Sequence, residues 1–556
     1  MIVKKYLVPF AVAALGHAAN AQQPPSAGGQ LIQIPPSPTL PRAAPEIRIE
    51  PRSAAPAAST GNEVKIVVKS LRITGERVYS EAELLALTGF VPGREVSLFD
   101  LQAMAARITE YYRGNGYFVA QAFVPAQDIK DNAVTITVSE GRYGQVMLRN
   151  RSNLADRVAL SSLEGLNAGD VIIAPPLESR LLVLSDLPGV AVKSTLVPGT
   201  TPGTSDLIVE VDPTQRVTGS IDADNAGNRY TGEYRIGATV NVNDPLGLGD
   251  IASVRALTSG SGLRYARLSY QLPVGRSQVG VAYSALEYSL GREFAPLRAH
   301  GTAQIASVFG RYPLIRSRTD NVYVQLAFDA KKFHDKVDSI PAVTDKKSRV
   351  LMASIYGDMR DSVGGGSLNS YGVTWSLGTL DIETPSALVA DQATARTNGH
   401  FSKLSFNAMR LQTLGGSFSV YAAINGQFAS KNLDVSEKME LGGMSGVRAY
   451  PEGEAYADQG AILTVEGRMD LPKYDSVPGR LQLVVFADAG TVTINKEPWA
   501  PGNNHRTLSG AGVGVNWALP GNFTLRAYYA HKLGNDVALS APDRSGRFWI
   551  QAVKYF

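Results

Sequence analysis

Residues 418–428 read FSVYAAINGQF, and most positions on one side of the alternation are apolar. This pattern predicts a β-strand with one apolar and one polar face. Similar stretches, separated by Gly, Asp, Asn and Pro, recur at 232–241, 279–289, 321–330, 461–470, 479–486 and 523–531. Counting outward from these, we find roughly sixteen such segments after residue 215, the pattern of tilted strands with one face toward lipid and one toward a polar lumen.

The later chain contains no apolar run that would suit a membrane-spanning helix, which needs about 18 or more such residues. In lipid, only helices and closed barrels satisfy every backbone N–H and C=O group. We therefore expect residues 216–556 to form a transmembrane β-barrel of about 16 antiparallel strands. A soluble all-β domain is the alternative interpretation.

The N-terminal residues have the features of a secretory leader. Lys4 and Lys5 precede the short apolar run 6–15, and Ala19-Asn20-Ala21 fits the small-x-small cleavage rule. We predict a signal peptide over residues 1–21, with an N-terminal membrane anchor as the alternative. The chain is thus expected to leave the cytoplasm.

A proline-rich linker is predicted over residues 22–62, which hold nine prolines. Proline lacks an amide donor and breaks helices, so this segment should be extended. Only a short piece around residues 29–34 is a candidate for a helix.

Two small α/β modules are predicted next, at residues 63–142 and 143–215. In the first, Ser80 and Glu83 form a potential capping box, and apolar residues recur at helical spacing over 99–113. Two alternating stretches, 118–124 and 133–138, follow as strands. The second module repeats the order with a strand over 143–150, a helix over 176–187, and strands over 190–197 and 206–211.

Composition removes several functional classes. The chain has no Cys, its six His residues are scattered singly, and its formal net charge is only +4. Thiol catalysis and Cys-based zinc sites are excluded, and nothing favours nucleic-acid binding. No nucleophile elbow or phosphate-binding loop is present, and Gly510, Gly512 and Gly514 alternate on a strand with no helix after them. We expect neither an enzyme nor a cofactor.

Several motifs resemble those of the transporters of two-partner secretion, the TpsB family of the POTRA-barrel superfamily. Residues 111–117 (YYRGNGY), 125–127 and 140–141 resemble their first POTRA domain, and residues 184–190 (LSDLPGV) the second. Residues 222–227 and 244–250 (DPLGLGD) resemble the first barrel hairpin. The final Phe556 resembles the signal that outer-membrane assembly machinery reads, although Lys554 stands where an aromatic is usual.

This resemblance implies an outer-membrane barrel with periplasmic POTRA domains that bind an unfolded client at residues 63–215. Such binding would use strand addition to an exposed sheet edge. From the residues alone, an equal alternative is that the two modules are purely structural domains whose sheet edges are covered. The implied partners are a secreted TpsA-like exoprotein of the adhesin or haemolysin class, outer-membrane lipid, and the barrel assembly machinery during biogenesis. A monomer is expected.

The resemblance also implies a functional site in the long connection 429–460. This connection carries Gly446-Val447-Arg448-Ala449-Tyr450, and Phe486-Ala487-Asp488-Ala489-Gly490 follows two strands later. In the superfamily the corresponding loop enters the lumen, which implies that Arg448 pairs with Asp488 beside Tyr450 and Phe486. Val447 and Gly490 complete the two motifs. A solvated arginine is the plainer interpretation of the residues, and Ala449 stands where the family has Gly.

Three functions remain open at this point. The first is export of a single client, without nucleotide hydrolysis, driven by folding outside the cell. The second is an assembly factor that inserts other barrels, which usually carries more POTRA domains. The third is a passive porin or receptor, which would need neither the two modules nor the Arg448 and Asp488 motifs.

Overall fold

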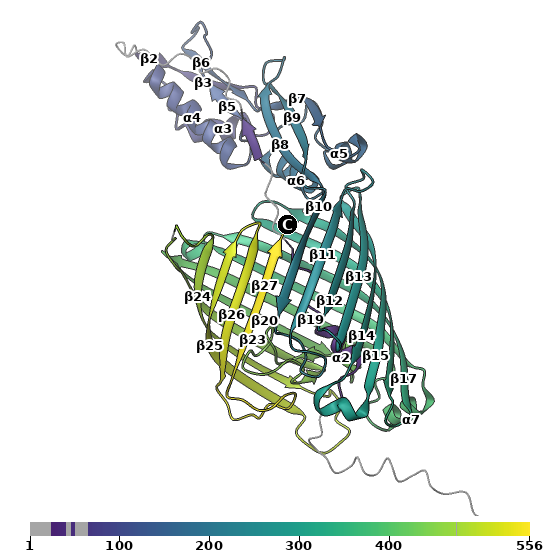
Figure 1. Ribbon diagram of the computed structural model, residues 1–556. Helices are drawn as coiled ribbons and strands as arrows, with labels where there is room; N and C mark the ends of the chain where they lie inside the picture. Colours follow the sequence, from purple (N-terminus) through teal and green to yellow (C-terminus); the bar gives the residue numbers. More distant parts are fainter. Residues whose placement is uncertain (1–23, 40–45, 50–64, 474) are drawn as a thin grey trace, which may run out of the picture.

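A computed structural model describes residues 24–39, 46–49, 65–473 and 475–556. The predicted signal peptide lies outside these ranges. A large barrel dominates the structure, and two small α/β modules stand at one of its ends (Figure 1). Among the described residues, no helix is both long enough and apolar enough to cross a bilayer.

The barrel closes through sixteen strands in the described part of the chain, each antiparallel to its neighbours, which confirms the predicted fold class. The first strand, β10, pairs with the last, β27, through residues 220–224 and 551–555. In order, the strands are β10 (Val217–Asp224), β11 (Arg235–Asn243), β12 (Ile251–Thr258), β13 (Leu263–Val274), β14 (Ser277–Ser289), β15 (Ala299–Arg316), β16 (Asp320–Val337), β17 (Ala342–Asp361), β18 (Ser367–Ile382), β19 (Gly399–Gly415), β20 (Phe418–Ala429), β23 (Gln459–Asp470), β24 (Arg480–Thr493), β25 (His505–Leu519), β26 (Phe523–Lys532) and β27 (Gly546–Tyr555).

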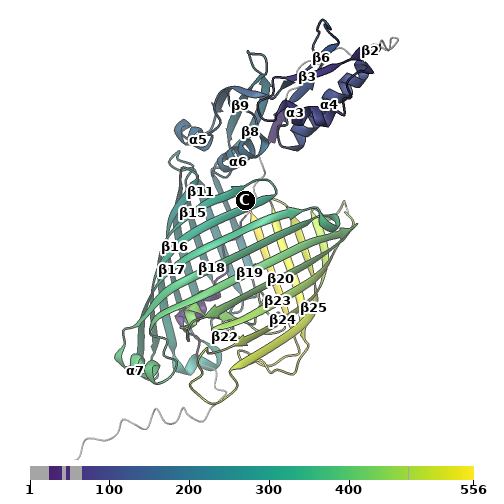
Figure 2. The same cartoon turned by 180° about the vertical axis from the view of Figure 1, so that it is seen from behind.

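Alternation places apolar side chains on the outside of the barrel and mostly polar ones inside. Val485 and Val513, for example, are 59% and 57% exposed to the surroundings of the barrel, whereas Asp488 is buried. Strands β15 to β19 have 16 to 20 residues, so the alternating stretches of about ten residues in the sequence, such as 321–330, underestimate their length. They continue past the length that a bilayer needs, toward the end opposite the modules (Figure 2).

The first module contains the two predicted helices, α3 (Glu81–Thr88) and α4 (Leu98–Gly114). Ser80 Oγ accepts from the Glu83 N–H, but the complete capping box belongs to α4, where Ser97 and Asp100 bond reciprocally. The helices cover a sheet of order β3-β6-β5, beside a second pair β2-β4. These strands are β2 (Lys65–Val68), β3 (Ser70–Thr74), β4 (Arg94–Ser97), β5 (Gln121–Phe123) and β6 (Ala133–Ser139).

The second module has a four-stranded sheet of order β1-β8-β9-β7, packed against α6 (Ala174–Ser185). Its own strands are β7 (Arg142–Asn150), β8 (Val190–Pro198) and β9 (Thr204–Pro213). The short helix α5 (Asp156–Ser162) was not predicted, because its seven residues are too few to show a clear period.

Two parts of the proline-rich segment form regular structure, a short helix near the predicted candidate and an extended strand. Helix α2 (Ala27–Ile32) lies inside the barrel, two residues earlier than the predicted candidate. Strand β1 (Glu46–Ile49) pairs in parallel with β8 and so forms the edge of the second module's sheet. Tertiary contacts, rather than local propensity, order both pieces.

The second module is docked on the barrel through the turn 244–250. Its Ala155 N–H donates to the Gly247 carbonyl over 2.8 Å, and Gly249 lies against Leu154 and Leu187. A Cβ on Gly247 would come within 2.8 Å of the Asn153 carbonyl oxygen, and its φ is +73°, so the turn requires glycine there. The DPLGLGD turn thus serves as the docking surface for the module.

Candidate functional site

The connection between β20 and β23, residues 430–458, folds back into the barrel, and we call it the lumen loop. It contains a 3-10 turn at Val435–Glu437 and a two-stranded hairpin of β21 (Met439–Glu440) and β22 (Tyr456–Ala457). Its tip, residues 446–450, is buried. The apolar cluster around it joins Val447 and Tyr450 to wall residues such as Phe486 and Trp549.

Arg448 at the tip contacts Asp488 on β24, as the resemblance implied. The guanidinium donates to the carboxylate over 2.9 Å from Nε and 2.8 Å from Nη2, and the Arg448 main-chain N–H donates over 3.1 Å. Both side chains are at most 5% exposed. Two parallel N–H···O bonds match the planar fork of arginine to a carboxylate, which makes this contact strong and directional.

A second carboxylate, which the sequence analysis missed, completes the pairing of Arg448. Nη1 donates to Glu466 on β23 over 2.8 Å, and Glu466 also pairs with Arg468 over 2.7 Å. Two carboxylates and two guanidinium groups therefore balance in the lumen. Glu466 and Arg468 occupy alternate positions of β23, and charges on the inward face of a strand were the signal available in the sequence.

Aromatic rings enclose the guanidinium from the barrel wall. Its Cζ lies 3.5 Å from the Phe486 ring centroid and 5.0 Å from that of Tyr528, and both distances fit cation–π contacts. Trp549 Nε1 donates to the Arg448 carbonyl over 2.7 Å. Phe486 was a predicted member of the site, whereas Tyr528 and Trp549 were not.

The three alternating glycines on β25 make room for this cluster. Gly510 and Gly512 stand opposite Asp488 and Phe486 in the strand register. A Cβ on Gly510 would lie 2.5 Å from the Ala449 Cβ, and one on Gly512 would lie 2.5 Å from the Phe486 ring. The Ala449 methyl, where the family has Gly, is thus accommodated by a missing side chain on the facing wall.

The other predicted site residues have separate contacts. Tyr450 does not pack on Phe486 as a ring pair; its hydroxyl donates to the Asp536 carbonyl over 3.2 Å, and Lys532 lies 4.6 Å from its ring centroid. Val447 is fully buried, and its N–H donates to the Leu441 carbonyl over 2.9 Å within the loop. Gly490 faces Leu441, whose Cδ1 would lie 2.5 Å from an added Cβ.

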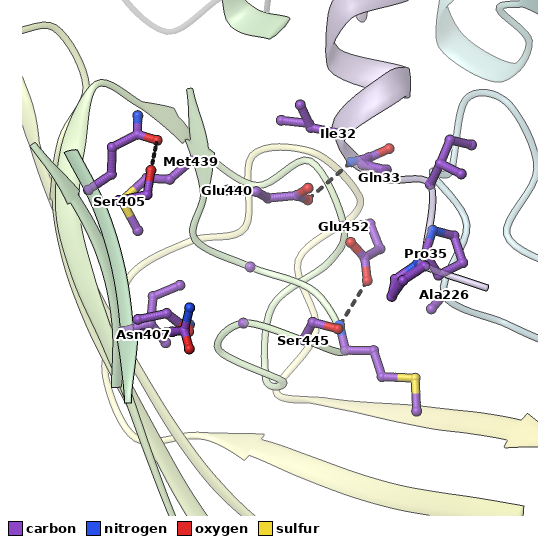
Figure 3. Close-up of a pocket in the computed structure, with 18 of the residues that line it drawn as sticks. Ile32, Gln33, Pro35, Ala226, Ser405, Asn407, Met439, Glu440, Ser445 and Glu452 are labelled. Atoms are coloured by element: carbon purple, nitrogen blue, oxygen red, sulfur yellow. Dashed lines mark hydrogen bonds between the residues drawn. The ribbon is translucent and has the colours of Figure 1, made fainter. Parts of the chain in front are cut away.

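Helix α2 and the lumen loop fill the lumen together. Gln33, just after α2, donates to Glu440 over 3.1 Å and to the Tyr456 hydroxyl over 2.9 Å. Figure 3 shows Gln33 directed toward Glu440, with Glu452 beside them on the same loop. A cavity of about 490 Å³ remains between these residues and wall residues such as Asn407. The lumen is thus obstructed rather than open.

A second group of ion pairs holds the start of the lumen loop to the wall. Glu437 pairs with Lys331 over 2.7 Å and Lys403 over 3.0 Å, and Asp434 pairs with Lys346 over 2.7 Å. The described ranges hold no group of three His, Asp or Glu side chains placed to bind a metal ion. The charges inside the barrel position the loop.

Comparisons with known proteins agree with this architecture. The family model described as "Haemolysin secretion/activation protein ShlB/FhaC/HecB" matches residues 203–517, and the ShlB-type POTRA domain model matches residues 66–141. The heme/hemopexin transporter protein HuxB of Haemophilus influenzae is 29% identical over 469 residues, which cover 84% of this chain and 82% of that protein. The outer membrane transporter CdiB of Dickeya dadantii is 23% identical, with 81% and 80% covered.

Solved structures show the same fold. CdiB from Escherichia coli superposes with a TM-score of 0.70 at 22% identity, over 91% of this chain and 93% of that one. BamA from Haemophilus ducreyi lacking POTRA domains 1-3 gives a lower TM-score of 0.53 at 15% identity, over 88% and 100%. Since the family model matches more than half of its residues, this chain belongs to the haemolysin secretion/activation family ShlB/FhaC/HecB, the outer-membrane transporters of two-partner secretion.

Proposed function

We propose that this transporter captures its unfolded client at the edge of the second POTRA domain and keeps its pore closed with the lumen loop until the client arrives. Export of a partner exoprotein across the outer membrane is the function of the family. To this family function the proposal adds which residues capture the client and which control the pore. The observation that carries it is a lumen filled by a loop whose tip is bonded to the wall.

Strand β1 supports the mode of capture. Residues 46–49 pair with β8 at 193–196, so the sheet edge already holds an extended segment of the same chain. Backbone hydrogen bonds supply most of the affinity in such pairing, and a client segment of alternating sequence satisfies the same edge. In this proposal the client replaces β1.

The Arg448 and Asp488 pair supports the mode of closure. A guanidinium with two carboxylates and two rings around it is costly to pull away, because each group left behind would be buried without its partner. A loop held in this way has one well-defined closed position. Its displacement then needs interactions that only the client supplies.

We further propose that the transporter works as a monomer in outer-membrane lipid, is inserted by the barrel assembly machinery, and is not an enzyme. The periplasm offers no nucleotide, so folding of the client outside the cell supplies the driving force. The alternative function, insertion of other barrels, is less favoured because only two POTRA-type modules precede the barrel in the described ranges and because the superposition on BamA is weaker.

Secretion of the partner exoprotein tests the assignment. Cells that carry both genes should release the exoprotein, and cells without the transporter should retain it. Arg448→Glu should abolish release, and the double variant with Asp488→Arg should restore part of it, since the ion pair is re-formed with reversed polarity. If Arg448→Glu secreted normally and the double variant changed nothing further, the lumen loop would have no part in export.

A further inference from the structure

Glu454 lies outside both sequence motifs, yet its carboxylate has several partners. It follows Arg448 of the lumen loop by six residues and is 4% exposed. Its carboxylate accepts from the Leu539 N–H over 2.9 Å, the Ser540 N–H over 3.0 Å and the Ser540 hydroxyl over 2.9 Å. Arg506 on β25 adds an ion pair. All of these donors lie outside the lumen loop.

Three of the donors belong to the connection between β26 and β27, residues 533–545, which we call the exit loop. Chain direction places it at the end of the barrel opposite the POTRA domains, where the lumen loop also begins. Ser540 is 1% and Ala538 6% exposed, whereas Leu533 and Val537 are 63% and 56% exposed. The middle of the exit loop therefore turns inward onto the lumen loop.

Other contacts join the two loops over the same short stretch. The Tyr450 hydroxyl donates to the Asp536 carbonyl over 3.2 Å, and the Ser540 hydroxyl also lies 3.0 Å from the Glu452 carbonyl. Arg506 bonds both loops, since it pairs with Glu454 and donates to the Val537 carbonyl over 2.7 Å. Glu454 is the charged centre of this interface.

The exit loop has no helix or strand of its own in the structure. Within the exit loop, the stabilising contacts are limited to hydrogen bonds such as the one that the Ala538 N–H donates to Asp543 Oδ1 over 2.8 Å. Without the Glu454 carboxylate, the buried Ser540 amide and the partly buried Leu539 amide would lose their acceptor, which is more costly than losing a solvated bond. The inward position of the exit loop therefore depends on the lumen loop being in place.

We propose that Glu454 is a positioning residue that couples the exit loop to the lumen loop, so that displacement of the lumen loop also releases the exit loop and widens the outer mouth for the client. The idea rests on the proposed gating role of the lumen loop. It extends that role to a second loop and names the residue that connects the two. A plain structural anchor would hold the exit loop but would not transmit movement.

Mobility of a single label on the exit loop tests the coupling without any client. The chain has no Cys, so Ala541→Cys provides one site for a spin label in the full-length protein in lipid. We expect both Glu454→Gln and Arg448→Ala to increase label mobility. A label at Val389→Cys, on helix α7 (Pro385–Ala393) in another connection at the same end, should be unaffected.

If Glu454→Gln frees the label and Arg448→Ala does not, Glu454 is an anchor only and the coupling is refuted. If neither variant changes the mobility of the label, the contact between Glu454 and the exit loop does not hold that loop in place. Because this measurement involves no secretion, it is independent of whether Arg448 gates export. Resistance of the folded barrel to detergent before heating shows in each case that the variant has folded.

Cross-linking tests the consequence for export. In a Glu452→Cys/Ser540→Cys variant, which keeps Glu454, a short, reducible bifunctional thiol reagent should join the two loops, because the Ser540 hydroxyl lies 3.0 Å from the Glu452 carbonyl. We expect export to be lost on cross-linking and restored on reduction. A Val389→Cys/Gln392→Cys pair within α7 serves as the control. Undiminished export by the cross-linked protein would overturn the proposal.

Discussion

Arg448 holds Asp488 with its side chain and its main chain together. Two guanidinium bonds of 2.9 and 2.8 Å and one amide bond of 3.1 Å reach the same carboxylate. The contact therefore fixes the backbone of the loop tip as well as the arginine side chain. One wall residue on β24 thus holds both the backbone and the side chain at the tip of a loop of 29 residues, 430–458.

Removal of the carboxylate should destabilise the protein strongly. In Asp488→Ala, Arg448 keeps only Glu466, and we expect the free energy of unfolding to fall by about 3 kcal/mol, within the range for a broken buried pair. Denaturant unfolding from lipid vesicles measures this value. The exposed pair Arg264–Glu287, 4.0 Å apart, provides the control, and Arg264→Ala should cost under about 1 kcal/mol. An equal loss of unfolding free energy in Asp488→Ala and Arg264→Ala would contradict a strong buried ion pair between Arg448 and Asp488.

Gly510→Ala should displace the loop tip without removing any charge. The added Cβ would lie 2.5 Å from the Ala449 Cβ, so the tip must move away from the wall. We expect higher conductance of the barrel in planar bilayers. Gly310→Ala on β15 is the matched control, because its Cβ would meet only Val279 at 3.8 Å.

The double variant Ala449→Gly/Gly510→Ala sharpens this test. It removes the methyl group that meets the new one and restores a glycine at the tip, as in the family. Conductance should then return toward that of the unchanged protein. Failure of this rescue would mean that Gly510 matters for the strand itself and not for the loop.

Alternation predicted the barrel well, because every second residue of a membrane strand faces lipid. The same rule placed Phe486 and Asp488 on one face, as the structure confirms. It failed for the ends of β15 to β19, since outside the bilayer the outward face need not be apolar. The sequence showed only a candidate near helix α2 and no sign of the pairing of strand β1, because contacts from residues far away in the sequence hold both in place, such as the bond from the Ala27 N–H to Asp335.

Strand β1 should compete with the client for the edge of the second POTRA domain. Ile47→Pro removes a backbone donor and weakens the pairing with β8. We therefore expect a peptide from the client to bind the full-length transporter more tightly, as measured by fluorescence anisotropy. Ser37→Pro, in a proline-rich stretch without strand pairing, is the control. Unchanged affinity in Ile47→Pro would place client binding at another edge.

The ion pair between Arg316 and Asp186 should fix the angle of the second POTRA domain on the barrel. Arg316 donates to both carboxylate oxygens of Asp186 over 2.8 Å and to Asn321 Oδ1 over 2.9 Å. The bond to Asn321 also orders the turn between β15 and β16. The turn 244–250 contacts the same domain at a different place. Arg318 also pairs with Glu178 of the domain, so without the Arg316 pair the domain should swing about the contacts that remain.

Distance measurements between two spin labels test this prediction. Labels at Glu164→Cys on the domain and Ser476→Cys on the barrel should show one narrow distribution, which Arg316→Ala broadens. Arg318, paired with Glu178 over 2.9 Å, has a side chain that is 43% exposed against 16% for Arg316, so Arg318→Ala should broaden the distribution less. If Arg316→Ala left the distribution narrow, the turn 244–250 and the other contacts would be enough to fix the domain, and this ion pair would not control its angle.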